Sequence, residues 1–592
     1  MTTYIKKIIF GLYMAMLALS CTELDLAQED AASSATWYQT KEQFRQSLNE
    51  GYREVFWPLD KPSSANSIGI NGWTDDFQRR DALDPIKAGT VSSEYGAAST
   101  QWANLYKAIT RMLVVLEQVE NQSGVLTDDE VSQYRAEVNY LRASYYSYLI
   151  AHFGDVPFYE QELTVDESFE LPRTDKNEIL QKIYGYYDDA ALNLPVRWDG
   201  VKYATKGAAY AMKARIALYM GDYATAAEAA EDCMDLGEYE LHPDFAELFE
   251  STTKNSIETI FHIPRSEALN TFDPDDEQDY LPRNHGGWGA RQPTWELLAS
   301  FECTDGLPID ESPLFDPQNP FKNRDPRCAM TIVPFGQLED GDGREPSDGT
   351  NFMGIEYTPH PASKQVLNFS SNELILNNDT RSIARFASFN GLAWKKGITE
   401  DWKDFQTDSD RIVIRYADVL LMYAESKIEL NQIDQSVLDA INEVRNRAYA
   451  NSGLDTPLIT STDQSVLRLK IRQERRSELA FEGMRYMDLI RWRLAEKALN
   501  GVLYGMLDVA SDGDVSIPPS GPLVDDVVTP GLWFWGIVPE IDEDGLPDFS
   551  PLLEAGLCRA LNTTSFPERQ YLWPIPAEER LLNSNLTQNE GY

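Results

Sequence analysis

The chain has 592 residues, of which 42% are hydrophobic and 25% charged, a composition typical of a globular protein and not of a disordered one. With 95 Asp and Glu against 52 Lys and Arg, its formal net charge is -43, and no run of basic residues offers a surface to phosphates, which argues against a nucleic-acid partner. We interpret the acidity as a well-solvated surface.

The N-terminus has the pattern of a bacterial lipoprotein signal. Two lysines precede an apolar stretch over residues 8–19, which is too short to span a bilayer but suits a secretory signal. Cys21 follows a small residue just after this stretch, although Ala18 stands where lipoprotein signals usually have Leu. We predict a signal peptide over residues 1–20, lipidation of Cys21 and a polar tether over residues 21–36. The alternative is a plain cleaved signal in which Cys21 is incidental.

Helical periodicity dominates the chain up to about residue 250. Apolar residues recur every three to four positions over residues 102–118 and again over residues 131–153. Residues 206–241 predict a helical hairpin, because small residues on both sides of a turn at Gly221 let two helices pack closely. This hairpin resembles a tetratricopeptide repeat, and residues 417–448 predict a second hairpin of the same kind.

Two regions interrupt the helical pattern. Residues 251–411 and 501–570 are rich in Gly, Pro, Asn and Asp and hold only short apolar runs, which predicts long loops with a few strands. We therefore expect a mainly α fold, an α/α superhelix of tetratricopeptide-like hairpins with long irregular loops and a few short strands. The helical scaffold would comprise about 37–250 and 412–500 within one domain over 37–592, and the loops would carry the ligand site.

Four motifs follow one another along the chain. They are AEVNYLRASYY at 136–146 with FGDVP at 153–157, RYADVLLMYAE at 415–425, ERRSELAFEG at 474–483 with the following Arg485, Asp488, Leu489, Arg491 and Trp492, and WPIP at 573–576 with NLTQNEGY at 585–592. In this order, behind a lipoprotein signal, they resemble the SusD/RagB family of outer-membrane nutrient-binding lipoproteins. Met484 stands where that family commonly has His, which we interpret as a tolerated change in packing.

The resemblance implies a function and a partner. Members of this family bind glycan nutrients at the cell surface and work with a TonB-dependent outer-membrane barrel of the SusC type. The lipoprotein sits over the barrel as a lid, its helical face contacts the barrel, and the ligand lies between the two. The resemblance therefore implies a lipid-anchored protein of the outer membrane that captures oligosaccharide or polysaccharide and hands it to a transporter.

Sugar binding narrows the choice of site residues. A flat aromatic side chain covers the C–H face of a pyranose, and burying roughly 80 Å² of that face contributes about 2 kcal/mol. Aromatic residues at helical spacing are mostly core, so the candidates are those in polar, Gly-rich loops, where members of the resembled family tend to bind. The predicted ligand contacts are Trp73 with Asp75 and Asp76, Trp288 with Arg291, and Trp394.

Enzyme motifs are missing from the sequence. There is no GxSxG elbow, HExxH helix, phosphate-binding Gly-rich loop or paired CxxC, and we expect no catalytic residue, metal or cofactor. Glu474 and Glu478 lie one helical turn apart and imitate an acid/base pair, but the arginines interleaved with them favour a structural ion-pair network. These arginines are Arg472, Arg475, Arg476 and Arg485.

Several alternatives stay open at the level of sequence. The chain could be a surface-anchored glycan hydrolase, a binder of peptides instead of glycans, or a tetratricopeptide scaffold that binds only proteins. A disulfide between Cys303 and Cys328 is chemically possible, although scattered cysteines in a chain of this size are more often unpaired. Asp340 and Asp342 begin like a calcium loop, but Arg344 stands where a third oxygen ligand is needed.

Overall fold

The computed structural model describes most of the chain after the predicted tether. The described residues are 37–57, 70–80, 82–200, 203–271, 273–274, 277–335, 351–360, 363–384, 386–404, 406–507 and 535–592. The predicted signal peptide, Cys21 with its tether, and the Asp340–Asp342 segment lie outside these ranges. Within them, no helix combines the length and the apolar character needed to cross a membrane.

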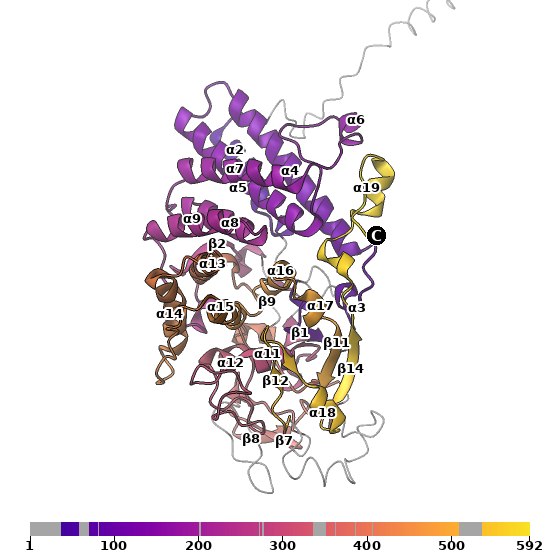
Figure 1. The fold of residues 1–592 in the computed structure, drawn as a ribbon. Helices are drawn as coiled ribbons and strands as arrows, with labels where there is room; N and C mark the ends of the chain where they lie inside the picture. Colours follow the sequence, from indigo (N-terminus) through magenta and orange to yellow (C-terminus); the bar gives the residue numbers. More distant parts are fainter. Residues whose placement is uncertain are drawn as a thin grey trace, which may run out of the picture.

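A stack of helices forms the upper part of the molecule in Figure 1. Its members are α2 (Lys41–Asn49), α4 (Gly96–Asn121), α5 (Asp128–Phe153), α7 (Lys176–Asn193), α8 (Lys206–Tyr219) and α9 (Tyr223–Asp235). From α4 onward, each of these helices packs on the next one in the chain. Local signals set the ends of α5, because Thr127 and Glu130 form a capping box at its start and Gly154 accepts a positive φ of 74° at its end.

A second helical group continues this stack. It contains α13 (Tyr416–Glu429), α14 (Gln435–Tyr449) and α15 (Gln464–Glu478), and α13 packs against α9 as well as against α14 and α15. Gly221, at a φ of 77°, makes the turn between α8 and α9. The two predicted hairpins are therefore present, and the prediction of a mainly α fold is confirmed.

Most of the short antiparallel ribbons and loops fill the lower part of the molecule, and one ribbon lies higher, against α8 (Figure 1). The pairs are β1 (Phe77–Arg79) with β4 (Arg291–Pro293), β2 (Thr259–Ile263) with β10 (Arg411–Arg415), β3 (Asp273–Pro274) with β9 (Gln406–Thr407), β11 (Gly501–Gly505) with β14 (Arg559–Thr564), and β12 (Glu540–Ile541) with β13 (Pro547–Asp548). One four-stranded sheet runs in the order β5 (Asn351–Phe352), β6 (Ile355–Glu356), β7 (Gln365–Asn368) and β8 (Glu373–Leu376).

Short helices connect these pieces. They are α3 (Pro85–Ala88), α6 (Val165–Ser168), α10 (Glu277–Tyr280), α11 (Trp295–Ser300), α12 (Pro326–Thr331), α16 (Arg485–Arg491), α17 (Ala495–Ala498), α18 (Ser550–Glu554) and α19 (Ala577–Leu582).

Two hydrophobic cores stabilise the molecule. The larger core lies within the helical stack, and the smaller one lies in the loop-rich half around Trp295, Trp535 and Phe549. The C-terminal segment closes the larger core, because the buried Trp573 donates its indole N–H to the Tyr486 hydroxyl at 2.9 Å. The loop-rich half therefore has a packed interior of its own, and its surface loops are held on a firm base.

Candidate functional site

Trp73 is a packing residue in this structure. It ends the 3-10 helix η3 (Ile70–Trp73), and its side chain is buried. Its ring lies edge-on to the rings of Trp573 and Tyr486, at centroid distances of 4.9 and 5.3 Å. Such edge-to-face contacts stabilise a core and leave little of the ring for a ligand.

Asp75 and Asp76 hold arginines in the interior. Arg485 donates two hydrogen bonds to Asp75, at 2.9 and 2.8 Å, and Arg476 donates to both carboxylates. Burial alone raises the pKa of Asp75, but the guanidinium groups of Arg476 and Arg485 outweigh it and hold that pKa below its ordinary value. The two carboxylates therefore fasten the segment after η3 to α15 and α16.

Arg291 and Trp394 are also enclosed. Arg291 forms a buried ion pair with Asp279 at 3.0 Å, and Trp394 stacks on Phe481 with 3.7 Å between ring centroids. The indole N–H of Trp394 donates to the Lys396 carbonyl at 2.8 Å. Five of the six predicted ligand contacts thus have buried protein partners, which gives them a supporting role here, and their contact with a ligand stays a prediction.

Trp288 is the exception among the predicted residues, because 47% of it is exposed. It follows the 3-10 helix η6 (Arg283–His285) in a tight turn, and a Cβ atom on Gly287 would lie only 2.0 Å from the carbonyl oxygen of Leu281. Gly289 donates its backbone N–H to that same carbonyl at 2.9 Å. Glycine at 287 is therefore required for the chain to double back here and present the Trp288 ring outward.

A second exposed aromatic residue lies close to Trp288. Phe386 is 48% exposed, and its ring centroid is 5.2 Å from the guanidinium carbon of Arg80. Arg80, just beyond β1, donates hydrogen bonds to the backbone carbonyls of both Trp288 and Phe386. One arginine thus joins two loops nearly 100 residues apart in the chain, each of which carries an exposed aromatic ring. We call the surface formed by Trp288, Phe386 and Arg80 the Trp288 face.

Phe389, three residues after Phe386, also lies beside guanidinium groups. Its centroid lies 4.5 Å from the guanidinium carbon of Arg381 and 5.5 Å from that of Arg559. Sequence reasoning overlooked both phenylalanines of this loop. The signal was present, since Phe389 precedes Asn390 and Gly391, the same polar and Gly-containing context that drew attention to Trp288.

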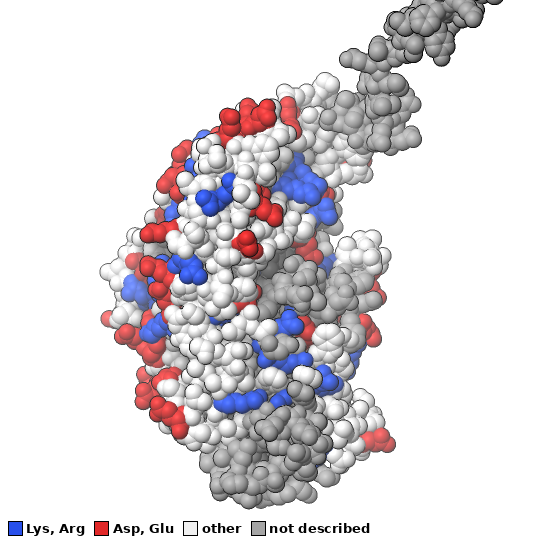
Figure 2. All heavy atoms as spheres, turned by 90° about the vertical axis from the view of Figure 1, so that its right-hand side faces the viewer, with Lys and Arg blue, Asp and Glu red and all other residues white. Residues whose placement is uncertain are grey.

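Basic residues gather on one side of the molecule although the net charge is -43. Figure 2 shows a band of Lys and Arg across the lower half of the side that carries β11 and β14, while Asp and Glu crowd the left-hand edge of the same view. The sequence contains no run of basic residues, so folding assembles this band from separate segments. A local basic patch therefore forms here without a run of basic residues in the sequence.

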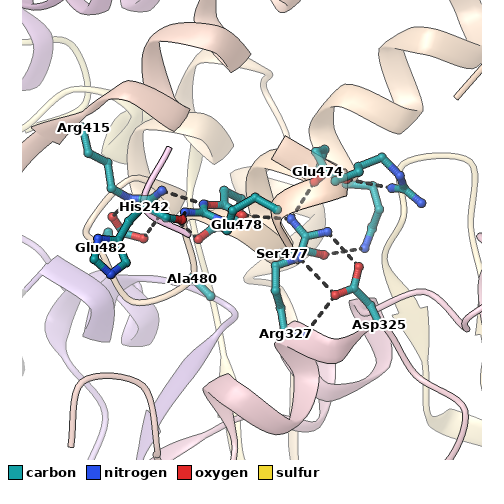
Figure 3. A network of polar contacts seen from close by, with 12 residues as sticks. His242, Asp325, Arg327, Arg415, Glu474, Ser477, Glu478, Ala480 and Glu482 are labelled. Carbon is teal, nitrogen blue, oxygen red and sulfur yellow. Dashed lines mark hydrogen bonds and ion pairs between the residues drawn. The ribbon is translucent and has the colours of Figure 1, made fainter. Parts of the chain in front are cut away.

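Glu474 and Glu478 belong to a buried ion-pair network, shown in Figure 3. Arg327 donates to Glu474 at 2.5 Å and to Glu478 at 3.0 Å, and Arg415 donates to Glu478 at 2.7 Å. Arg447 donates to Glu478 as well. Both carboxylates are fully enclosed by guanidinium groups, so neither one faces a space that a substrate and water could enter. The prediction of a structural network is confirmed.

The arginines of this network are not the ones that the sequence suggested. Arg475 pairs with Asp418 at 2.9 Å, and Arg476 and Arg485 pair with Asp75. On a helix, residues one position apart point in different directions, so neighbours in the sequence serve different partners. The network therefore ties α15 to elements on all sides.

Other titratable groups near the Trp288 face have structural partners. Asp379 is buried and accepts the backbone N–H groups of Arg283 and Asn284, and burial raises its pKa to about 6. Asp379 thereby supports the turn that carries Trp288. Burial lowers the pKa of His285 to about 4.

Among the described residues, no group of three His, Cys, Asp or Glu side chains is arranged to hold a metal ion. Cys303 and Cys328 are buried free thiols.

Comparisons with known proteins identify the family. A profile described as the SusD family matches residues 262–515. A second profile, described as "Starch-binding associating with outer membrane", matches residues 60–218. The chain belongs to the SusD family.

Relatives of this SusD-family protein resemble it along most of their length. A SusD-like protein of Formosa agariphila is 25% identical over 506 residues, which cover 82% of this chain and 90% of that protein. The starch-binding protein SusD of Bacteroides thetaiotaomicron is 23% identical over 554 residues, 85% of this chain and 80% of that one. A solved SusD-like carbohydrate binding protein from Bacteroides fragilis superimposes with a TM-score of 0.70 at 27% identity, covering 93% of this chain and 99% of that one. The predicted family is confirmed.

Proposed function

We propose that this SusD-family protein captures oligosaccharide or polysaccharide at the cell surface and delivers it to a SusC-like TonB-dependent transporter, without cleaving it. The observation that carries this proposal is the Trp288 face, in which Arg80 holds two exposed aromatic rings on neighbouring loops. The names of the relatives, which include a starch-binding protein and a carbohydrate binding protein, support the same ligand class.

The energetics of the Trp288 face suit the capture of a polymer. Each pyranose C–H face that covers an aromatic ring contributes about 2 kcal/mol from roughly 80 Å² of buried surface. Two rings therefore supply about 4 kcal/mol of favourable burial, from which the costs of association are subtracted. Hydrogen bonds to hydroxyl groups and the presence of many binding registers along one polymer raise the apparent affinity further. Weak capture of this kind also permits release into a transporter.

The membrane anchor and the partner belong to the same proposal. Acylation of Cys21 would hold the fold at the outer membrane through the tether over residues 21–36. The test is metabolic labelling with a fatty-acid analogue in the native host. A Cys21→Ala variant should not be labelled and should no longer be found in the membrane fraction. Co-purification of the tagged protein with a TonB-dependent barrel tests the partner.

A substitution at Trp288 tests glycan binding directly. Retardation in native gels that contain soluble polysaccharides should find at least one ligand for the wild-type protein. Trp288→Ala should then lower the affinity of the protein for that polysaccharide by at least about tenfold, because one aromatic ring that stacks on the sugar is lost. The matched control is Phe169→Ala, which removes an aromatic residue of 42% exposure just after α6 in the helical half and should leave affinity unchanged.

Three outcomes would count against the proposal. Equal affinity of the Trp288→Ala and wild-type proteins would remove the Trp288 face as the site. Release of sugar by the purified protein, abolished by replacing one carboxylate, would favour the glycan hydrolase instead. Binding of a peptide mixture with no binding of any polysaccharide would favour a peptide ligand or a protein scaffold.

A further inference from the structure

A cavity distinct from the Trp288 face opens beside the β2–β10 ribbon. Its volume is about 140 Å³. Several of the residues around it, such as Glu250, Thr253 and Asp410, are half-buried, so the cavity meets the surface. We call it the Trp402 pocket, and its aromatic and charged walls include Tyr280, Trp394, Lys396, Trp402, Asp410 and Phe481.

Two of the aromatic residues that line this pocket, Phe249 and Trp402, are half-buried. Trp394 stacks on Phe481 and also meets the edge of Tyr280 at 4.9 Å. Trp402, on the 3-10 helix η7 (Glu400–Asp404), is only half-buried, and Tyr280 approaches it edge-on at 5.8 Å. The ammonium group of Lys396 lies over the Phe249 ring, 4.3 Å from its centroid. The indole of Trp402 is therefore the aromatic surface in this wall that a ligand can cover.

The polar edge of Trp402 supplies a second observation. Its indole nitrogen Nε1 is buried and has no hydrogen-bond acceptor in the structure. A buried indole N–H normally finds a partner, as those of Trp394 and Trp573 do here. The pocket thus combines an aromatic ring with a donor that lacks an acceptor.

The charges around the pocket are balanced. Three positive and three negative side chains line it, and these are Arg265, Lys396 and Arg411 with Glu250, Asp410 and Glu482. Lys396 pairs with Glu482 at 2.6 Å, and Asp410 lies 3.5 Å from Lys254. A ligand with a net charge would find no excess of the opposite sign, whereas hydroxyl groups could accept from Trp402 and donate to carboxylates such as Asp410.

The cavity is large enough for a ligand of several waters' size. A single water needs at least about 10–15 Å³ of cavity volume, and this cavity has about 140 Å³. A hexopyranose occupies about as much space as six waters in the liquid, at about 30 Å³ each. We propose that the Trp402 pocket is a second binding site, which takes a single uncharged pyranose with its C–H face on Trp402 and a ring or hydroxyl oxygen as acceptor for the indole N–H.

Monosaccharide binding by the mature chain tests this inference. The probes are glucose, galactose and mannose, with glucuronate and glucosamine as charged analogues, measured by saturation-transfer NMR and by tryptophan fluorescence. At least one neutral hexose should bind saturably in the millimolar range, and the charged analogues should bind more weakly. Trp402→Phe keeps a ring but removes the donor, and it should weaken binding by about fivefold.

Two further variants distinguish the loss of binding in the pocket from a loss of the fold and from binding at the Trp288 face. Thr253→Phe places a bulky side chain at the pocket wall and leaves every aromatic residue of the wild type in the sequence. It should abolish hexose binding while the far-UV circular dichroism spectrum stays unchanged. Trp288→Ala should leave hexose binding intact, even where it removes polysaccharide binding. Three outcomes would overturn the inference and leave the proposed function standing. They are no saturable hexose binding by the wild-type protein, hexose affinity in Trp402→Phe and Thr253→Phe equal to that of the wild type, and tighter binding of a charged analogue than of any neutral hexose.

Discussion

Glu478, on α15, and Arg415, at the end of β10 and the start of α13, form a buried ion pair of 2.7 Å. Arg327, on α12, reaches the same glutamate from the loop-rich half, at 3.0 Å. Both ends of this pair are at most 1% exposed. One carboxylate therefore connects the scaffold to the part of the molecule that carries the exposed rings.

Neutralising Glu478 should destabilise the whole fold. Glu478→Gln leaves Arg327, Arg415 and Arg447 without a charge that each of them contacts in the interior. Removing one partner of a buried ion pair costs about 3–5 kcal/mol, and we expect the free energy of unfolding in urea to fall by that amount. The matched control is Glu160→Gln, which breaks an exposed pair with Lys182 and should cost less than about 1 kcal/mol. Similar values for the two variants would contradict the role given to Glu478.

Stability should fall as the pH is lowered from 7 to 5. Burial lowers the pKa of His152 to about 4, whereas an unfolded histidine has a pKa near 6.5. Between these values the unfolded chain binds a proton that the folded chain excludes, so the free energy of unfolding decreases as the pH falls. His152 should contribute about 2 kcal/mol of this loss at pH 5. His152→Gln should therefore show a smaller difference between urea unfolding at pH 7 and at pH 5, and an unchanged difference would contradict the assignment.

The helical scaffold was predictable because its signals are local. The apolar spacing of α4 and α5, the turn at Gly221 and the small residues of α8 and α9 all act within a few turns of helix. Short-range hydrogen bonding and packing decide such elements, so a single sequence contains enough information to find them.

The site residues were harder to predict because distant partners decide their exposure. Asp75 and Asp76 look like loop residues open to solvent, but Arg485 and Arg476, 410 and 400 positions further along, bury them. Trp288 stayed exposed because its turn is set by neighbouring glycines. Arg80, 306 positions before Phe386, holds the Phe386 loop beside the Trp288 loop, and no local pattern in the sequence contains that information.

Adding one methyl group at Gly287 should disturb the Trp288 face. In Gly287→Ala the new Cβ would lie 2.0 Å from the Leu281 carbonyl oxygen, so the backbone of the turn must move. We expect a loss of about 1–3 kcal/mol in the free energy of unfolding and weaker glycan binding, because the ring of Trp288 shifts. Gly96→Ala is the control, since nothing lies within 4 Å of its Cβ at the start of α4, and it should be neutral or slightly stabilising. Unchanged glycan affinity in Gly287→Ala would show that the turn does not set the position of the ring.

Replacing Arg80 should weaken binding while both aromatic rings remain. The planar guanidinium group donates to the carbonyls of Trp288 and Phe386 together and lies over the Phe386 ring. Both hydrogen bonds come from one guanidinium nitrogen, Nη1. Lysine keeps the charge, but its side chain ends one bond short of that nitrogen and has no planar group to lie over Phe386, so Arg80→Lys should hold at most one of the two loops. Losing one such hydrogen bond costs about 1.5–3 kcal/mol, and we expect glycan affinity to fall by about tenfold or more. Because Arg80 lies near the surface, the free energy of unfolding should change by less than about 1 kcal/mol. An Arg80→Lys protein with wild-type affinity would mean that the two rings bind independently of each other.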